Sequence, residues 1–342
     1  MSGRHVNIPI FVPHLGCPFQ CIFCNQKKIS GTAEIPDGPA VRKIVDSYLE
    51  TIDREKCSVE IAFFGGSFTA VPQELQRELL ESVQDYVEQS SAGIRISTRP
   101  DFIDQEILDR LKEYHVTTIE LGVQSMCDDV LLSSGRGHTA EDVRRAAKLI
   151  RQNGFSLGLQ MMPGLPGDTV EKSVRTAEEI IALQPDIVRI YPTLVVKDTV
   201  LAQLYQAGEY TPLSVEEAVE LCAGLLERFY ENGIRVIRVG LCQTDSMTPD
   251  GDIVAGPYHP AFRELCEGKL YLKKLCEILD KRKVQDKSII IYADKSKFSY
   301  IAGHNRDNII YITEKYRLQD VGFCHSSDGK LRIETVQKKN IF

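Results

Sequence analysis

Residues 6–24 read Val6-Asn-Ile-Pro-Ile-Phe-Val-Pro-His-Leu-Gly-Cys17-Pro-Phe-Gln-Cys21-Ile-Phe-Cys24, and this stretch decides the fold. A strand-like run leads into a short loop whose C-x3-C-x2-C spacing can wrap a metal centre. A structural zinc site needs four ligands; no second cysteine pair is near, although His14 could serve as the fourth. A 4Fe-4S cluster held by only three thiolates keeps one iron open to an outside ligand. The spacing therefore predicts a cluster on Cys17, Cys21 and Cys24, with a zinc knuckle or chance clustering as the alternatives.

Beyond this loop, short apolar runs alternate with longer amphipathic stretches, the pattern of a parallel sheet with crossover helices. Leu75, Leu79 and Leu80, for example, recur at helical spacing. Six or seven such units predict an α/β fold, a partial (β/α)6 TIM-like barrel with its active site at the carboxyl ends of the strands. The expected strands are Val6–Val12, Val59–Phe64, Ile94–Ser97, Thr118–Val123, Ser156–Met161 and Ile187–Tyr191, or seven with Val236–Val239.

The sequence pattern changes after the charged run Asp280-Lys-Arg-Lys283. Turn-like segments there separate short apolar runs, which predicts a small antiparallel module. We therefore expect a core domain over residues 1–280 and a small, basic, β-rich C-terminal module over residues 281–342. The strands expected in the module are Ser288–Tyr292, Phe298–Ile301, Asn308–Ile312 and Lys330–Glu334.

Charge is unevenly spread along the chain. The net charge is −7, yet residues 281–342 hold 13 Lys and Arg against 7 Asp and Glu, which gives +6. A basic end segment on an acidic body is a candidate patch for polyanions. No run approaches the ~18 apolar residues of a membrane span, and the first residues carry no export signal. We therefore expect a cytoplasmic protein without membrane contact, and its ten cysteines are read as thiols and ligands rather than disulfides.

Six further segments follow the predicted strands in order. Together with the aromatic residue before Cys24, they resemble the radical S-adenosylmethionine (SAM) superfamily and, within it, the radical domain of the Elongator catalytic subunit. The resemblance runs from about Pro9 to about Tyr271. Gly122-Val-Gln124 and Gly164-Leu-Pro166 are also similar to the oxygen-independent coproporphyrinogen oxidases. The segments are Gly65-Gly-Ser-Phe-Thr-Ala-Val-Pro72, Thr98-Arg-Pro-Asp101, Ile119-Glu-Leu-Gly-Val-Gln-Ser125, Arg136-Gly-His-Thr139, Met161-Met-Pro-Gly-Leu-Pro166 and Tyr191-Pro-Thr-Leu-Val195.

The resemblance implies two cofactors, the 4Fe-4S cluster and S-adenosylmethionine chelated at its open iron. One electron then cleaves the cofactor to methionine and a 5′-deoxyadenosyl radical, which takes a hydrogen atom from the substrate. Ser97 stands where these families usually have a glutamate, which puts one polar contact to the cofactor in doubt. The cofactor-binding residues implied are Phe23, Gly65, Gly66, Ser67, Gln124, Arg136 and Gln160.

The resemblance also implies a substrate and partners. We expect modification of the wobble uridine of transfer RNA, with tRNA bound through the C-terminal module, and an external electron donor of flavodoxin or ferredoxin type. The Elongator subunit continues into an acetyltransferase domain, but only about 60 residues follow Asp280, so carboxymethyl transfer is not implied. The alternatives are a radical SAM enzyme acting on a small anionic metabolite, such as a tetrapyrrole carboxylate, and a non-catalytic iron–sulfur or zinc binding module.

Four further residues are candidates for substrate binding or catalysis. Arg189 and Tyr191 share one face at the end of the sixth strand; facing inward, they would hold an anionic or base-like substrate, and otherwise they form a surface salt bridge and packing. Cys242, like Cys127, follows a predicted strand and either donates a hydrogen atom, carries the substrate or packs as a buried thiol. His259 belongs to a proline-rich loop that closes the barrel, where it is a candidate polar group over the active site.

Overall fold

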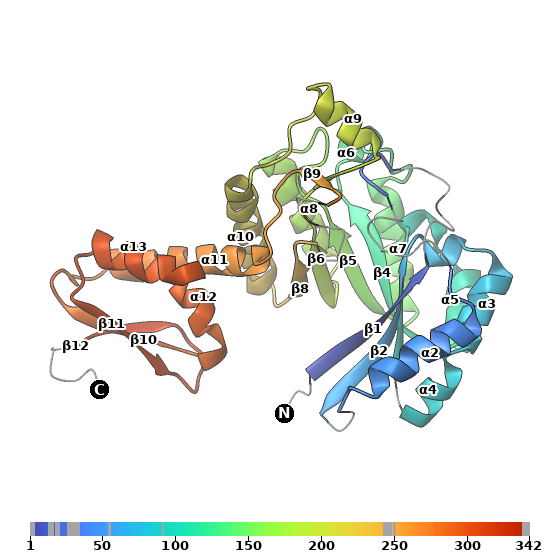
Figure 1. Ribbon diagram of the computed structural model, residues 1–342, viewed down its shortest axis with the longest axis horizontal. Coiled ribbons are helices and arrows are strands. Elements are labelled where there is room, and N and C mark those ends of the chain that lie inside the picture. The colour runs from blue at the N-terminus through green and yellow to red at the C-terminus, as the bar shows by residue number, and fades with distance from the viewer. Residues whose placement is uncertain are drawn as a thin grey trace. The chain divides into compact units, whose positions relative to one another are not determined.

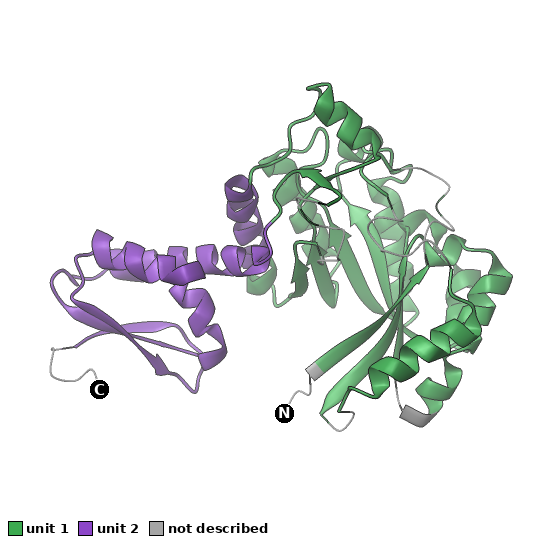
Figure 2. Cartoon of the chain, viewed as in Figure 1, with its two compact units in different colours: residues 1–214, 229–258 green, residues 215–228, 259–342 purple. Residues whose placement is uncertain are grey.

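The computed structural model consists of two compact units (Figure 2). The first comprises Met1–Ser214 and Phe229–Tyr258, and the second Val215–Arg228 and His259–Phe342. The domain boundary expected after residue 280 stays a prediction. The residues that the structure describes are 4–12, 17, 21–25, 35–53, 56–90, 92–241, 248 and 251–336.

A seven-stranded sheet frames the first unit and curls into a half-barrel (Figure 1). Its order is β1 (Arg4–Val12), β2 (Cys57–Gly65), β3 (Gly93–Thr98), β4 (Val116–Gln124), β5 (Ser156–Met161), β6 (Ile187–Ile190) and β8 (Arg235–Val239). Every neighbouring pair of strands is parallel, so the carboxyl ends of all the strands lie at one end of the half-barrel. This arrangement confirms the predicted α/β partial barrel.

Amphipathic helices connect the strands. Helix α7 (Ala140–Gln152) shows how the sequence specifies these helices. Thr139 caps its first turn in a capping box with Asp142. The apolar residues at helical spacing between Val143 and Ile150 form its buried face. No helix in the described part of the chain has the length and apolar character needed to cross a bilayer. The other helices of this unit are α2 (Gly38–Leu49), α3 (Gln73–Glu81), α4 (Gln84–Ser90), α5 (Gln105–Glu113), α6 (Asp128–Ser133), α8 (Val170–Ala182) and α9 (Val200–Gln206), with short 3-10 turns at Phe68–Ala70 and Pro100–Phe102.

Strand β1 illustrates how alternation positions the site. Ile8 and Ile10 are fully buried, whereas Asn7, Pro9 and Phe11 line a pocket inside the half-barrel. Successive side chains of a strand point to opposite faces, so one set packs under the helices and the other faces the interior. The same parity brings polar side chains of β4, β5, β6 and β8 to that interior.

The second unit contains a three-stranded sheet in the order β11-β10-β12. Strand β10 (Ser288–Ala293) pairs in parallel with β11 (Asp320–His325) and antiparallel with β12 (Arg332–Val336). Its buried side chains share a core with the buried face of α11 (Phe262–Asp280). The remaining elements are α12 (Phe298–Ala302), α13 (Asp307–Lys315), the larger part of α10 (Val215–Glu231), and 3-10 turns at Lys295–Lys297 and His304–Arg306.

Three predictions for this unit were wrong. The segments Phe298–Ile301 and Asn308–Ile312 form α12 and α13 rather than strands, and the strand β11 was missed. The sheet is accordingly mixed instead of antiparallel. In α13, Ile309 and Ile312 are buried while Ile310 and Tyr311 are exposed, a helical rather than an alternating pattern. The segments between the turns are too short for sequence periodicity to distinguish a helix from a strand.

Candidate functional site

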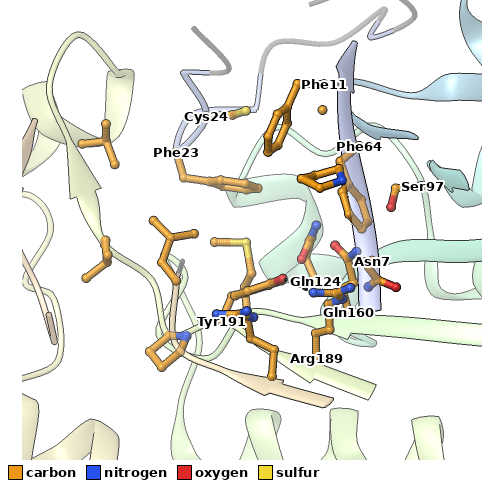
Figure 3. Close-up of a pocket in the computed structure, with 18 residues that line it drawn as sticks. Asn7, Phe11, Phe23, Cys24, Phe64, Ser97, Gln124, Gln160, Arg189 and Tyr191 are labelled. Carbon is orange, nitrogen blue, oxygen red and sulfur yellow. Dashed lines mark hydrogen bonds between the residues drawn. The ribbon is translucent and has the colours of Figure 1, made fainter. Parts of the chain in front are cut away.

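A cavity of about 430 Å³ opens inside the half-barrel of the first unit (Figure 3). Its volume lies within the range usual for small-molecule sites. Its lining combines aromatic and aliphatic side chains with a few polar groups from the strand ends. The lining residues are Asn7, Pro9, Phe11, Phe23, Cys24, Phe64, Gly65, Ser97, Gln124, Gln160, Met162, Arg189, Tyr191, Pro192, Leu194, Val196, Arg238 and Leu241.

The cavity has two sides with different chemistry. We call one the rim, formed by Phe23, Cys24, Gly65 and Gln124 of the cysteine loop and the strand ends. We call the other the floor, formed by Arg189, Tyr191 and Arg238 above the buried carboxylate of Glu120. Figure 3 shows Cys24 and Phe23 on the side opposite Arg189 and Tyr191.

The cysteine loop lies at the rim. Cys24 lines the cavity, Cys21 is buried, and Nη1 of Arg136 lies 3.3 Å from the Cys21 Sγ. Although Cys17 is exposed as a residue, desolvation and the nearby Cys21 raise the pKa of its thiol, and the guanidinium of Arg136 opposes the rise. These thiols are therefore near each other and near positive charge. Residues 18–20 and His14 lie outside the described residues.

The donor set of this loop fits an iron–sulfur cluster better than a single metal ion. Among the described residues, no three His, Cys, Asp or Glu side chains form a group that could hold one ion. Three thiolates on a four-iron cluster each bind a different iron, so they need not converge on one point. The arginine beside Cys21 also suits a negatively charged cluster.

The glycine segment after β2 lets the backbone come close to a ligand. Gly65 has a φ of 121°, and a Cβ there would lie 2.6 Å from the carbonyl oxygen of Val12. The Gly66 amide donates to that same oxygen over 3.0 Å. The Ser67 hydroxyl is buried, 2.8 Å from the hydroxyl of Thr98. Gly65 thus faces the cavity, while Gly66 and Ser67 hold the turn.

Three polar residues expected at the cofactor lie at or near the rim. Gln124 ends β4 with a φ of 67°, and its Oε1 is buried without a hydrogen-bond partner among the described residues. Gln160 lines the cavity and donates to Glu120 over 2.9 Å. Arg136 does not line the cavity; besides contacting Cys21, it donates to the carbonyl oxygen of Gly122 over 2.5 Å. A strained residue with an unmet acceptor is typical of a ligand site.

A buried ion network lies under the cavity, and the sequence did not reveal it. Arg95 donates to both Glu60 and Glu120, and Arg189 donates to Glu120 over 2.7 and 3.0 Å. Burial alone would raise the pKa of Glu60, but its hydrogen bond with His5 and the charge of Arg95 lower that pKa to about 2. Burial of Glu120 is likewise outweighed by Arg189 and Arg95, which lower its pKa. Both carboxylates are therefore ionised inside the half-barrel.

Arg189 and Tyr191 both face inward, as one of the two sequence interpretations required. Arg189 donates to the Tyr191 hydroxyl over 3.3 Å, and its guanidinium carbon lies 5.3 Å from the centroid of the Phe64 ring. Its charge is balanced by Glu120. Burial raises the pKa of Tyr191, so the phenol keeps its proton.

The other candidates are not brought to the cavity in the described residues. Cys242 lies outside them. Cys127 precedes α6 and lines a separate polar cavity with Asp129 and Lys172. His259 belongs to the second unit, where its ring lies 5.5 Å from that of His304, edge to face. Its role over an active site stays a prediction.

Sequence reasoning also missed several residues that line the cavity, among them Asn7, Phe11, Phe64 and Arg238. A signal for Arg238 was available. The strand segment Val236-Ile-Arg-Val239 repeats the pattern of Ile187-Val-Arg-Ile190, with an arginine at the same position. Strand alternation then predicts that both arginines share one face.

Comparison with known families agrees with this geometry. Residues 11–180 match the family model of the radical SAM superfamily, and residues 185–272 match the model of the radical SAM C-terminal domain. The first segment contains the three cysteines and the glycine turn. The second contains Arg189, Tyr191 and Arg238.

Individual relatives point the same way. The chain is 30% identical over 245 residues to a tRNA uridine(34) acetyltransferase of Methanocaldococcus jannaschii, which covers 60% of the chain and 45% of the relative. It is 31% identical over 261 residues to human Elongator complex protein 3, covering 68% of the chain and 47% of the relative. The chain thus spans about half the length of these relatives. The structure of an N-terminally truncated Elp3 from Methanocaldococcus infernus has the same fold, with a TM-score of 0.64 at 23% identity over 80% of this chain and 64% of that one.

Proposed function

The chain belongs to the radical SAM superfamily, whose cofactors are a 4Fe-4S cluster and S-adenosylmethionine, and from this premise we propose that it is a radical enzyme that modifies a uridine of transfer RNA. One observation carries the proposal. The cysteine loop, the Gly65 turn and the unmet acceptor of Gln124 meet at the rim of one cavity.

The residues of this chain have distinct tasks in the proposal. Cys17, Cys21 and Cys24 hold the cluster, and Arg136 balances its negative charge beside Cys21. Phe23, Gly65, Gln124 and Gln160 contact S-adenosylmethionine, and Gly66 and Ser67 hold the turn that admits it. When bound, the two cofactors supply one-electron cleavage of a carbon–sulfur bond and abstraction of a hydrogen atom from the substrate.

The floor holds polar side chains in fixed positions, and the aromatic lining beside it gives an apolar, water-poor setting. Glu120 fixes Arg189 and Gln160, and aromatic side chains of β1 and β2 line the cavity beside them. Such a lining suits a planar base and excludes water, which would otherwise quench reactive species. An external donor of flavodoxin or ferredoxin type delivers the electron.

Transfer RNA as substrate is supported by the relatives and by the second unit. One of the relatives reported above, the tRNA uridine(34) acetyltransferase, acts on tRNA uridine by name, although the match covers only 45% of its length. Residues 281–342 carry +6, and the exposed Tyr311 of α13 has the ammonium of Lys315 5.7 Å from its ring centroid. An exposed aromatic ring beside cations is typical of contact with unpaired bases. Tyr316 and Phe298, by contrast, pack in the core.

The runner-up is a radical SAM enzyme acting on a small anionic metabolite. The acidic body, −13 over residues 1–280, favours it because that charge repels RNA phosphates. Two experiments decide between the possibilities, one for the chemistry and one for the substrate.

The chemistry is tested by anaerobic reconstitution. The wild-type protein should take up about four irons and cleave S-adenosylmethionine when reduced. The variant Cys21→Ser should lose both, whereas Cys57→Ser, a change on β2 outside the triad, should keep both. Zinc retained in place of iron would contradict the proposal and favour a structural metal site.

The substrate is tested by deleting the gene and comparing the nucleosides of bulk tRNA by mass spectrometry. A wobble-uridine derivative should disappear and return with the wild-type gene, but not with the Cys21→Ser gene. Binding of RNA should weaken with salt, and Lys315→Gln together with Tyr311→Ala should weaken it further. An unchanged nucleoside profile with no measurable RNA binding would favour the metabolite.

A further inference from the structure

The floor of the cavity holds one positive charge that no described acid balances. The ionised side chains that form the network or face the cavity beside it are Glu60 and Glu120 against Arg95, Arg189 and Arg238. The excess charge belongs to Arg238, because the other two arginines are ion-paired.

Glu120 has no acceptor site left for Arg238. Its Oε1 accepts from Arg95 and Arg189, and its Oε2 accepts from Arg189 and Gln160. A carboxylate offers about four lone-pair sites, and these four donors fill them. Within the described residues, Arg238 makes no ion pair with any carboxylate.

Strand pairing makes this arrangement costly without a ligand. Arg238 on β8 lies directly across from Arg189 on β6, and both line the cavity. Like charges opposite each other on neighbouring strands destabilise a sheet. Glu120 neutralises only one of the two.

Tyr191 offers a second donor at the same place. Its oxygen accepts from Arg189, and no described residue accepts the hydrogen of its hydroxyl. Arg238 and Tyr191 both line the same cavity. A guanidinium and a phenolic O–H that share one pocket wall provide charge-assisted donors of the kind that bind oxyanions.

We propose that Arg238 and Tyr191 form an oxyanion site in the cavity floor, which takes the phosphate of the substrate nucleotide. The choice of a phosphate as the ligand rests on the proposed RNA substrate. The carboxylate of a small metabolite would be bound by the same donors. The site lies opposite the rim, so it anchors the substrate and not the cofactor. It would hold the nucleotide by its phosphate while the reacting atom faces the rim.

The test compares uridine 5′-monophosphate with uridine by NMR titration, without cluster or S-adenosylmethionine. Wild-type protein should bind the monophosphate about tenfold more tightly than the nucleoside, the effect of one charge-assisted contact. Arg238→Gln should abolish the difference, Arg238→Lys should keep part of it, and Tyr191→Phe should reduce it. Arg235→Gln, at an exposed arginine of the same strand, should leave it unchanged.

Thermal unfolding separates a binding role from a structural one. Inorganic phosphate should raise the melting temperature of the wild type and not that of Arg238→Gln. Without phosphate, Arg238→Gln should be at least as stable as the wild type, because a like-charge pair is relieved. A loss of stability without phosphate would show that Arg238 is structural and would overturn the proposal.

Coproporphyrin III serves as the carboxylate probe. If its binding depends on Arg238 while the monophosphate does not bind, the oxyanion site stands and the RNA substrate fails. If the binding of neither probe nor of inorganic phosphate depends on Arg238, the oxyanion site is refuted, while the cluster and tRNA proposals are unaffected. Equal losses in Arg235→Gln would also refute it, because they would indicate only a diffuse charge effect.

Discussion

The rim and the floor of the cavity differ in whether their buried polar atoms have hydrogen-bond partners. Near the rim, the Oε1 of Gln124 and the Nε of Arg136 are buried without a partner among the described residues. At the floor, Glu120 accepts four hydrogen bonds and holds two arginines and an amide. An unmet buried polar atom costs ~1–3 kcal/mol, so the rim is built to be completed by a ligand. The floor is complete and serves to fix side chains in position, with Arg238 as its exception.

The largest effect is expected from breaking the floor. Glu120→Ala leaves Arg95 and Arg189 buried without their shared counter-charge, which should lower the free energy of unfolding by about 3–5 kcal/mol. Urea unfolding measures it. Glu113→Ala, at an exposed glutamate of α5, should change it by no more than about 0.5 kcal/mol. Similar values for the two variants would refute a closed network.

The next effect concerns a histidine near the rim and depends on pH. Burial, helped by the charges of Arg136 and Arg99, lowers the pKa of His138 to about 3. Below the ordinary pKa of 6.5, the unfolded chain protonates this imidazole whereas the folded chain does not. The contribution of His138 to the free energy of unfolding is therefore complete above pH 6.5 and is lost as the pH falls.

The free energy of unfolding should therefore fall by about 1.4 kcal/mol per pH unit between pH 6 and pH 5 on account of His138. His138→Gln, whose amide nitrogen can take the place of Nε2 and donate to the carbonyl oxygen of Val123, should remove that slope. Chemical unfolding at several pH values measures it. A slope that persists in the variant would mean that other groups cause it. The lowered pKa of Glu60 acts in a separate window, where stability present above pH 4.5 is lost as pH falls toward 2.

An effect of similar size is expected at the glycine turn of the rim. Gly65→Ala places a Cβ against the Val12 carbonyl at a strained φ, and should cost about 1–3 kcal/mol. Gly154→Ala is the matched control, because its φ of 82° is also positive but no atom lies within 4 Å of the added Cβ. It should cost about 1 kcal/mol or less. Equal losses would show that the close approach to Val12 contributes nothing.

The smallest effect is expected at Ser97, which lies across from Glu120 in the strand register but outside its network. Its Oγ is buried and makes no hydrogen bond to the described residues. Ser97→Ala should not lower the free energy of unfolding and should raise it by up to about 1 kcal/mol, because no bond is lost and an unmet buried hydroxyl is removed. A loss above 1 kcal/mol, measured by the same urea titration, would indicate a contact that the static geometry does not contain.

Sequence patterns were sufficient for the frame of the first unit. Strand β5 was predicted with its observed bounds, Ser156–Met161, and Val236–Val239 proved to belong to the seventh strand of the sheet. Long alternations of strand and helix carry strong periodicity, because each element buries one face. The family resemblance named Gly65, Gln124 and Gln160, and strand parity named Arg189 and Tyr191; all five line one cavity.

What sequence could not provide was register and side-chain pairing. Glu60, Arg95 and Glu120 each read as a polar residue within an apolar strand, and only their inward direction joins them. The partners of Arg189 therefore remained unknown, and with them the lack of a partner for Arg238. In the second unit, segments of four or five residues such as Phe298–Ile301 were too short to tell helix from strand.

The most direct test of the central claim is electron paramagnetic resonance of the reduced, anaerobically reconstituted protein with and without S-adenosylmethionine. The protein should show the signal of a 4Fe-4S cluster held by Cys17, Cys21 and Cys24, and that signal should change when the cofactor binds the open iron. Cys21→Ser should show neither. A cluster signal that S-adenosylmethionine leaves unchanged, or a protein that takes up zinc and no iron, would contradict it.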